Sequence, residues 1–358
     1  MGDMTKNGGI GRVISILSNH MVDNQNLLVH ILSFFNTGKN NFYYISDKIT
    51  QNYLYDERIN MKKAIILGGH LKLRRFLIDN KIDVLIVAGA LFFPISILAC
   101  KPTNIKCICW EHSNLKNNDV FFKRFCRLFA AYRADWIVVL TKRDFESYKK
   151  KYGISNICQI YNPIDPNIYK HEHAYKQSAK KIISVGRLCY AKNYEILIQI
   201  AKEVFRKIDD WEWHIYGEGE LREKLETLIR EADLEKRVKL KGQRNNIYEL
   251  YSEYAFLVMT SRYEGFPMVL IEGLACGLPL VSFDIYTGPS EIIKNGENGY
   301  LIEKNNYREM ANKIMKLIND LQMRKKMSDE SKDISAKFNV SEIGLKWIDL
   351  LHKMVDEK

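Results

Sequence analysis

The sequence predicts an α/β protein made of two doubly wound domains, each with a parallel sheet between helices. Short, β-branched and almost continuously apolar runs alternate with helix-like runs along most of the 358 residues. Strands that are buried on both faces of a parallel sheet have this composition. The alternation is interrupted at residues 161–181, a polar stretch with two prolines, and then resumes, which indicates a linker between two domains.

Three runs in the first half are typical of buried strands: DVLIV, IKCICW and DWIVVL, at residues 83–87, 105–110 and 135–140. Residues 121–133 carry a stripe of Phe, Leu and Tyr at helical spacing, which predicts an amphipathic helix. The apolar stretch at 84–100 has only 17 residues and contains Gly89 and Pro94. A strand, a turn and an apolar helix therefore fit it better than a membrane span.

Five runs in the second half are typical of strands, at residues 181–186, 213–217, 238–242, 255–260 and 278–283. The helix expected after the first of them carries Leu197, Ile200, Ala201 and Val204 on one face. From about residue 306 to the end of the chain the pattern is helical.

The chain is basic, with a formal net charge of +11 and a pI near 9.1. Such a surface suits nucleic acid, an anionic membrane or phosphorylated small molecules, and charge alone does not choose among them. The seven cysteines are odd in number, lack C-x-x-C spacing and lie mostly in apolar runs. They indicate reduced thiols in a cytoplasmic protein without a secretory leader, and they argue against a zinc site or a disulfide framework.

Near the start, Asn7-Gly8-Gly9-Ile10-Gly11-Arg12 resembles a turn that holds an anion. Such a turn normally follows a buried strand, but only six residues precede it here and none lies in an apolar run. A flexible start is the alternative. We expect that the first strand of the N-terminal domain is missing, and a start codon placed too late is the favoured explanation.

Ligands of open parallel sheets bind outside the carboxyl ends of the strands, so the residues that follow each strand are candidates for a site. Arg187 and Lys192 follow the strand at 181–186, where two cations near a helix start suit a diphosphate. A solvated basic turn is the alternative. After the next strand, Gly217 and Gly219 flank Glu218 and would let the backbone approach a ligand, although ordinary turn glycines explain them nearly as well.

The stretch SRYEGFPMVLIEGLACGLP follows the strand at 255–260. We expect Pro267 to be the first helical residue, and Gly277 with Pro279 to mark the end of that helix. The exposed N–H groups of residues 265–268 would then face a ligand.

Two carboxylates in this stretch would lie at either end of one helical turn, with Glu264 in the preceding loop and Glu272 about five residues into the helix. Glu264 suits a sugar hydroxyl or a developing cation, and Glu272 suits two ribose hydroxyls. A surface position is the alternative for Glu272. Because its neighbours are apolar, however, we expect a ligand or a cationic partner, since an unpaired buried carboxylate is costly.

The pattern Glu264-x7-Glu272, together with SVGRL…KN and YGEGE, resembles the retaining glycosyltransferases of family 4, which have the GT-B fold. The resemblance spans essentially the whole chain, with a glycine turn at the start, EHS in the first half and NPID at the linker. Residues 181–302 are its specific part. The variant Thr287-Gly288-Pro289-Ser290-Glu291, where many relatives carry a double glycine, is similar to a subgroup that assembles bacterial surface polysaccharides such as O-antigen and capsule. There Glu291 would touch the ligand or cap a helix.

The resemblance implies two Rossmann-like domains facing across a cleft: an acceptor-binding domain at 1–162 and a nucleotide-sugar-binding domain at 163–335. It also implies a C-terminal helix at 336–358 that packs back on the first domain. The residues that match the family's donor diphosphate site are Arg187, Lys192, Gly9 and Gly11. Those that match the ribose and nucleoside site are Glu272, Gly217 and Glu218. Those that match the donor-sugar loop are Gly265, Phe266, Pro267 and Met268. The resemblance makes Glu264 and His112 catalytic, and a capping or core histidine is the alternative for His112.

The implied activity is retaining, metal-independent transfer of a hexose or N-acetylhexosamine from a nucleotide diphosphate sugar, expected to be UDP-linked. Arg187, Lys192 and helix N-termini would replace a metal, and no cofactor is expected. The acceptor would be a glycan or a lipid-diphosphate-linked saccharide in polysaccharide biosynthesis. One alternative is a GT-B sugar-nucleotide epimerase or phosphorylase. Another is a non-catalytic basic protein that binds membranes or nucleic acid, although no aromatic-basic recognition motif for nucleic acid is present.

The helix at 121–133 carries Lys123, Arg124, Arg127 and Arg133 beside its Phe/Leu/Tyr stripe. Such a helix can rest on an anionic membrane, which would suit a polyprenyl-diphosphate-linked acceptor at the inner face of the cytoplasmic membrane. A core-packing helix with a basic solvent edge explains the same pattern at least as well.

Overall fold

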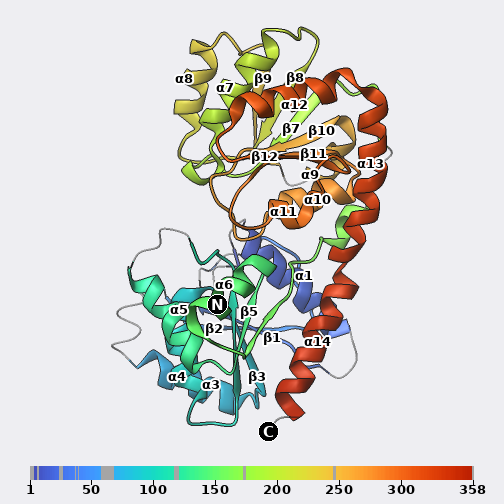
Figure 1. The fold of residues 1–358 in the computed structure, drawn as a ribbon. Coiled ribbons are helices and arrows are strands. Elements are labelled where there is room, and N and C mark those ends of the chain that lie inside the picture. The colour runs from blue at the N-terminus through green and yellow to red at the C-terminus, as the bar shows by residue number, and fades with distance from the viewer. Residues whose placement is uncertain are drawn as a thin grey trace. The chain divides into compact units, whose positions relative to one another are not determined.

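The computed structural model describes residues 4–5, 8–23, 27–36, 38, 40–57, 68–116, 121–171, 175–244 and 247–356. The chain forms two compact units (Figure 1). The first unit consists of Met1–Pro163 together with Val340–Lys358, and the second of Ile164–Asn339. The C-terminal helix therefore belongs to the first unit. The expected domain limits were residues 162 and 335.

The first unit contains a four-stranded parallel sheet in the order β3-β4-β5-β6. Its strands are β3 (Val84–Ala88), β4 (Lys106–Glu111), β5 (Trp136–Val139) and β6 (Ile157–Gln159). The first three confirm the predicted strands. A separate parallel pair, which the sequence analysis did not predict, joins β1 (His30–Phe35) and β2 (Thr50–Tyr55).

The helices described in the first unit are α1 (Gly9–Asp23), α3 (Gly69–Asp79), α4 (Phe93–Cys100), α5 (Phe121–Arg133), α6 (Lys142–Tyr152) and α14 (Val340–Asp356). Helices α4, α6 and α14 pack against the four-stranded sheet, and α1 packs on α14. The apolar stretch at 84–100 is β3, the 3-10 turn η1 (Ala90–Phe92) and α4, as predicted. In the part of the chain that the structure describes, no helix is both long enough and apolar enough to cross a bilayer.

The start of the chain differs from the predicted turn. Helix α1 begins at Gly9, so Gly9 and Gly11 lie in its first turn rather than in a loop after a strand. Asn7 lies outside the described residues, and none of the described residues before Gly9 is in a strand.

The second unit is a six-stranded parallel sheet in the order β12-β11-β10-β7-β8-β9. Its strands are β7 (Lys181–Val185), β8 (Glu212–Tyr216), β9 (Val238–Gly242), β10 (Phe256–Met259), β11 (Leu280–Asp284) and β12 (Gly299–Glu303). The first five confirm the prediction, and the edge strand β12 was missed. From β7 the chain builds outward through β8 and β9 and then returns to the other side of β7 with β10, so the strand order reverses between β7 and β10.

The helices of the second unit are α7 (Tyr194–Phe205), α8 (Arg222–Glu231), α9 (Ile247–Leu250), α10 (Met268–Ala275), α11 (Pro289–Ile292), α12 (Tyr307–Asn319) and α13 (Leu321–Ser335). Helix α7 packs against α8 and α12, and its predicted apolar face is buried. Helix α10 packs against α13, and every α10 residue from Val269 to Ala275 is buried. The contact with α13 and the burial of these residues place α10 in the core of the second unit.

The ends of α10 differ slightly from the prediction. Pro267 is the N-cap rather than the first helical residue, which is Met268. At the other end, Gly277 adopts φ +69°, and its N–H donates to the carbonyl of Leu274. A left-handed residue just after the helix is the usual position for glycine, so the predicted stop is confirmed.

None of the seven cysteines forms a disulfide. Five of them are buried, and desolvation raises the pKa of Cys126 to about 11. The burial of these five agrees with their position in apolar runs of the sequence.

Candidate functional site

The candidate site lies where the strand order of the second sheet reverses. In doubly wound sheets, ligands bind at this point because the loops after the two central strands leave in opposite directions. Here those loops follow β7 and β10, and they carry Arg187, Lys192 and Glu264. Three of the sequence-predicted residues are therefore brought to one edge of one sheet.

Lys192 and Glu264 form an ion pair at this edge. The Nζ atom of Lys192 donates to Oε1 of Glu264 at 2.6 Å, and the two side chains are only 21% and 15% exposed. The hydroxyl of Ser261 donates to the same oxygen at 2.7 Å. A partly desolvated, charge-assisted contact of this kind is stronger than a surface ion pair.

The two loops are also joined through their backbones. The N–H of Arg262 donates to the carbonyl of Ala191 at 2.8 Å, and the Thr260 hydroxyl donates to the carbonyl of Lys192 at 3.0 Å. These contacts hold the segment with Lys192 beside the segment with Glu264. Ser261 and Thr260 were not singled out from the sequence, because short hydroxyl residues in a loop carry no distinguishing pattern.

The variant TGPSE segment braces the loop with Glu264. The Thr287 hydroxyl donates to the backbone carbonyl of Glu264 at 2.7 Å. Gly288 has φ +102°, and a Cβ atom placed on it would lie 2.2 Å from Cδ of Pro267. Only glycine fits this position, so Gly288 lets the segment lie close against Pro267.

The segment Gly265–Met268 leads into α10, whose N-cap Pro267 makes no side-chain capping bond. The first N–H groups of such a helix are directed outward and suit an anion or a sugar oxygen. The side chain of Phe266 does not contribute to this edge, because it is buried and packs on Phe338 with ring centroids 5.7 Å apart. Only the backbone of Phe266 therefore lies at this edge.

Glu272 is 3% exposed on α10, which excludes the surface position considered as an alternative. Its Oε2 atom accepts a hydrogen bond from the Tyr251 hydroxyl at 3.1 Å. We expected a ligand or a cation beside it, and this partner is a neutral phenol. Tyr251 is fully buried and was not identified from the sequence.

Arg187 and Glu218 are more exposed than the ion pair. Arg187 contacts Glu220 at 3.0 Å with its own side chain 72% exposed, so this contact contributes little energy. Glu218 accepts from Arg222 at 2.7 Å. A Cβ on Gly217 would lie 2.0 Å from the carbonyl oxygen of Gly186, so the loops after β7 and β8 touch at a glycine that no other residue can replace.

His112 belongs to the first unit and directly follows β4. Its ring lies on Trp110 with centroids 4.2 Å apart. Part of the residue is exposed, but Nε2 is buried and has no hydrogen-bond partner within the described ranges. Burial lowers the pKa of His112 to about 3, so the imidazole is neutral at physiological pH.

The sequence suggested that Arg127 belongs to a basic surface edge, but the structure shows that it does not. Its side chain is buried and its Nε atom donates to Glu111 at 2.7 Å. The buried face of α5 is formed by Cys126, Arg127, Ala130 and Ala131.

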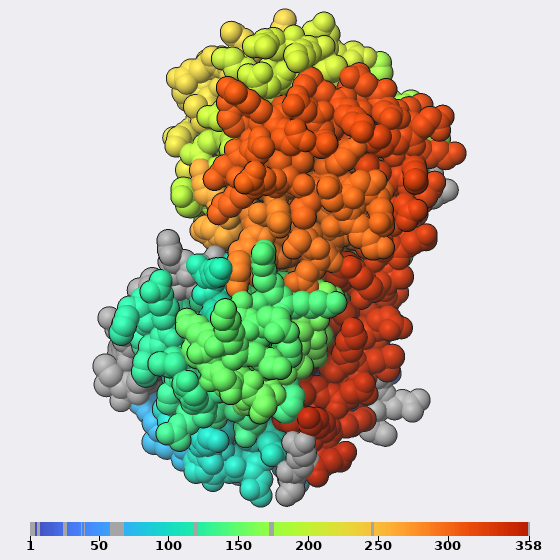
Figure 2. Space-filling view, viewed as in Figure 1, coloured from blue at the N-terminus to red at the C-terminus, as the bar shows by residue number. Residues whose placement is uncertain are grey.

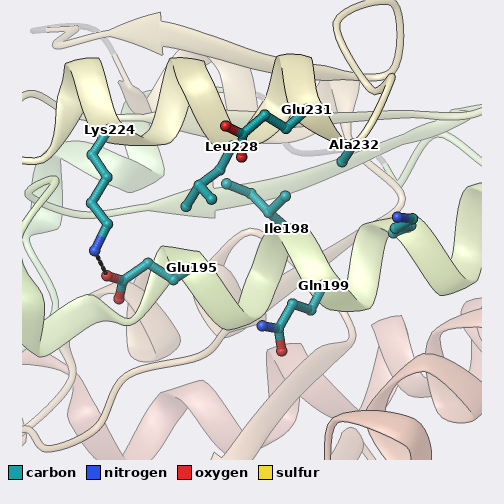
Figure 3. Close-up of a pocket in the computed structure, with 8 residues that line it drawn as sticks. Glu195, Ile198, Gln199, Lys224, Leu228, Glu231 and Ala232 are labelled. Carbon is teal, nitrogen blue, oxygen red and sulfur yellow. Dashed lines mark hydrogen bonds and ion pairs between the residues drawn. The ribbon is translucent and has the colours of Figure 1, made fainter.

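A separate groove of about 410 Å³ lies between α7 and α8 (Figure 3). Ile198 and Leu228 form its apolar part, and an ion pair of 2.8 Å joins Lys224 to Glu195 at one end. None of its lining residues belongs to the loops after β7 and β10. It is therefore distinct from the candidate site.

Comparison with known proteins identifies the family. The model of the family Glycosyltransferase Family 4 matches residues 7–168, and that of Glycosyl transferases group 1 matches residues 166–334. An uncharacterized glycosyltransferase of Haemophilus influenzae is 30% identical over 322 residues, which are 89% of this chain and 90% of that protein. The chain is a member of glycosyltransferase family 4.

Two further relatives of this glycosyltransferase have more descriptive names. The amylovoran biosynthesis glycosyltransferase AmsD of Erwinia amylovora is 29% identical, covering 98% of this chain and 97% of AmsD. A Campylobacter jejuni enzyme, named N-acetylgalactosamine-N,N'-diacetylbacillosaminyl-diphospho-undecaprenol 4-alpha-N-acetylgalactosaminyltransferase, is 35% identical over 213 residues. That match covers 58% of this chain and 57% of the Campylobacter enzyme.

Solved structures establish the fold of this glycosyltransferase as GT-B. Anabaena HepE in complex with UDP superposes with a TM-score of 0.81 at 18% identity, covering 98% of both chains. Staphylococcus aureus TarM, solved with UDP, Fondaparinux and alpha-GlcNAc-glycerol, gives a TM-score of 0.70 at 26% identity. It covers 79% of this chain and 59% of TarM.

Proposed function

We propose that this glycosyltransferase moves a hexose or N-acetylhexosamine from a UDP-linked donor to a saccharide acceptor in the assembly of a bacterial polysaccharide. The observation that carries the proposal is the Lys192–Glu264 pair at the reversal point of the second sheet. In this pair, a cation that would bind a diphosphate contacts a carboxylate that would bind a sugar. The names of AmsD and of the Campylobacter enzyme support the glycan and the lipid-diphosphate-linked acceptor, and the UDP in HepE and TarM supports the donor.

The donor diphosphate would bind Lys192 and Arg187. An ammonium group has three N–H donors, so Lys192 can meet a phosphate oxygen while one proton still contacts Glu264. Arg187 can turn from its exposed contact with Glu220 at little cost. We propose the same diphosphate role for the first turn of α1, where Gly9 and Gly11 lie.

The rest of the donor would bind along the same edge. Glu272 would accept from the ribose hydroxyls, and Gly217 and Glu218 would border the nucleoside. The donor sugar would lie against the backbone of residues 265–268, with Glu264 at its hydroxyls or at the cation that develops on its ring. His112, which is neutral, would exchange hydrogen bonds with a sugar hydroxyl rather than supply charge.

The proposed chemistry is transfer with retention and without a metal. The bond from the sugar C1 to the diphosphate oxygen breaks, and the acceptor hydroxyl forms a new C1–O bond on the same face. The acceptor proton passes to the departing diphosphate. Charge that develops on that group would be offset by Arg187, Lys192 and the helix N-terminal N–H groups.

We also propose that α5 rests on an anionic membrane at the inner face of the cytoplasmic membrane, which would bring a lipid-linked acceptor close. The support is that the Phe/Leu/Tyr stripe points outward: Phe121 is 83% exposed, and Phe125, Leu128 and Tyr132 are also exposed. Arg124 and Arg133 are exposed on the same helix, which lies at the surface of the first unit (Figure 2). Apolar and basic side chains on one exposed helix are typical of interfacial helices.

Sedimentation with vesicles tests the membrane contact. The protein is expected to sediment with vesicles that contain anionic lipid and not with neutral ones. A Phe121→Ser, Phe125→Ser variant is expected to stay in the supernatant, and a Leu345→Ser variant, exposed on α14, should behave like the wild type. Equal sedimentation of the Phe121→Ser, Phe125→Ser variant and the wild type would refute the proposed contact.

A transfer assay tests the proposed reaction. Wild type is incubated with UDP-glucose, UDP-GlcNAc and UDP-GalNAc and an undecaprenyl-diphosphate-linked saccharide, and released UDP is measured. Lys192→Ala and Glu264→Gln are each expected to lower kcat/KM about 100-fold or more, because each removes a group aimed at developing charge. Lys224→Ala, in the groove of Figure 3, is the matched control and should be unchanged. The proposal fails if the wild type turns over no nucleotide sugar, or if the product has the inverted anomeric configuration.

A further inference from the structure

In the first unit, a fully buried ion pair includes the residue directly before His112. Glu111 is the last residue of β4, and Arg127 comes from α5. The Nε atom of Arg127 donates to Oε2 of Glu111 at 2.7 Å, and both side chains are 1% exposed. Charges are rarely buried this completely unless every group is hydrogen-bonded.

Ser113 closes this pair into a ring of hydrogen bonds. Its backbone N–H and its hydroxyl both donate to Oε1 of Glu111, at 2.9 and 2.7 Å. The same hydroxyl accepts from Nη2 of Arg127 at 2.7 Å. A hydroxyl has one donor and two acceptor sites, so this arrangement is chemically complete. The ring fixes the backbone on both sides of His112.

Aromatic side chains next to Glu111 support the imidazole of His112. Consecutive residues of a strand point to opposite faces, so Glu111 faces α5 while Trp110 and His112 face the other way. Trp110 lies between His112 at 4.2 Å and Trp347 of α14 at 4.9 Å, measured between ring centroids. The backbone is thus tied on one face of the sheet while the imidazole lies on an aromatic support on the other.

The far end of the segment is tied as well. The N–H of Leu115 donates to Oδ1 of Asp144 at 3.0 Å, and the N–H of Asp144 donates to the N-cap hydroxyl of Thr141. Asp144 belongs to α6, which follows β5, the neighbour of β4 in the sheet. Residues 111–115 are therefore held at both ends by buried side chains of two different helices.

We propose that Glu111 and Arg127 are positioning residues that hold His112 for the transfer reaction. A buried ion pair is weak evidence for stability, because well-packed apolar residues of similar volume often stabilise a protein as well or better. Apolar residues would not reproduce the geometry of this segment. Only the charged pair forms hydrogen bonds with both the backbone N–H and the hydroxyl of Ser113. The proposal rests on the proposed function insofar as His112 acts on the donor sugar.

The test replaces both charges together, with Glu111→Met and Arg127→Met in one variant. The expected result is a melting temperature within a few degrees of the wild type and unchanged UDP affinity, because none of the proposed UDP-binding residues lies on β4 or α5. We also expect at least a tenfold fall in kcat and broadened or doubled NMR signals from the His112 imidazole. The single variant Arg127→Lys, which keeps the charge, should have a kcat between that of the double variant and that of the wild type. The matched control removes the exposed pair Asp23–Lys48 with Asp23→Asn and Lys48→Met and should change nothing.

A stable double variant with the wild-type kcat and a single wild-type His112 signal overturns the inference. If the double variant does not fold, Ser113→Ala supplies the same test, because it keeps the ion pair and removes the hydroxyl that joins both charges, leaving only the backbone N–H bond to Glu111. A Ser113→Ala variant with unchanged kcat and unchanged His112 signals would then overturn it. Failure of the proposed function would look different: the wild type would transfer no sugar, while the His112 signals would still change in the variants.

Discussion

The ammonium of Lys192 and the carboxylate of Glu264 neutralise each other. An incoming diphosphate would meet a site in which one cation is already engaged and the other, Arg187, is exposed. Binding of the diphosphate to Lys192 would weaken its hold on Glu264, because the ammonium would then share its N–H donors between the phosphate and the carboxylate. At the scale of single residues, this pair would therefore couple the two halves of the proposed donor.

His112 yields a prediction about pH. Its folded pKa is about 3, below the value of about 6.5 expected for an unfolded imidazole, so the unfolded chain binds the proton first. As pH falls below about 6, the folded state therefore loses up to about 1.4 kcal/mol per pH unit through this residue. His112→Gln should remove that contribution. Denaturant unfolding between pH 7 and pH 4 measures the difference between wild type and variant.

The control for this prediction is His352→Gln, an exposed position on α14. It should leave the pH dependence of unfolding unchanged. If wild type and His112→Gln lose stability in parallel from pH 7 to pH 4, the buried, neutral state of His112 is wrong.

Spacing in the sequence places single residues relative to the ends of strands and helices, but it does not show the contacts that join distant parts of the chain. Arg187, Lys192, Glu264 and Glu272 follow from strand ends and the helix start. The contact between Lys192 and Glu264 spans 72 positions and depends on β7 lying next to β10, which no local pattern shows. Tyr251 and the contact of Thr287 with Glu264 were missed for the same reason, because these hydrogen bonds span 21 and 23 positions.

At the scale of elements, α10 shows how glycines fix a helix that carries a site. Gly288 lets the neighbouring loop approach Pro267 before the helix, and Gly277 lets the chain turn after it. Between these points the helix is almost entirely buried, so the packing around α10 fixes the position of Glu272.

Substitution of Gly277 tests this account against a matched position. Gly277 and Gly153 each follow a helix, and each adopts φ near +65°. Alanine at either position should therefore cost about 1–2 kcal/mol of backbone strain. A Cβ at Gly277 would also lie 2.7 Å from Cε of Lys332 and 3.1 Å from Oγ of Ser328, whereas at Gly153 it meets nothing within 4 Å. Denaturant unfolding should therefore show a larger loss for Gly277→Ala. An equal loss at both positions would contradict the packing described for α10.

The strands were predictable where burial makes them continuously apolar, as in β4 and β10. The edge strand β12 and the pair β1 and β2 were missed, since short or partly polar strands such as TQNYLY carry no such signal. The spacing in α5 predicted a helix correctly but not its orientation. The large aromatic residues point outward, and the small residues Cys126, Ala130 and Ala131 let the helix approach the sheet.

At the scale of the whole molecule, two units share one chain, and its last helix belongs to the first unit. The alternation of strands and helices predicted both sheets, and the two family models together cover residues 7–334. The donor and acceptor remain matters of proposal, because they depend on a few loop side chains that leave the pattern of strands and helices unchanged.

The central claim is that the reversal point of the second sheet binds the diphosphate of a UDP-linked donor. Titration calorimetry with UDP tests it most directly, on wild type, Lys192→Ala and Lys224→Ala. The account predicts saturable one-to-one binding by the wild type, at least tenfold weaker binding by Lys192→Ala, equivalent to about 1.4 kcal/mol, and wild-type affinity for Lys224→Ala. Absence of UDP binding by the wild type, or equal affinity in Lys192→Ala, would contradict it.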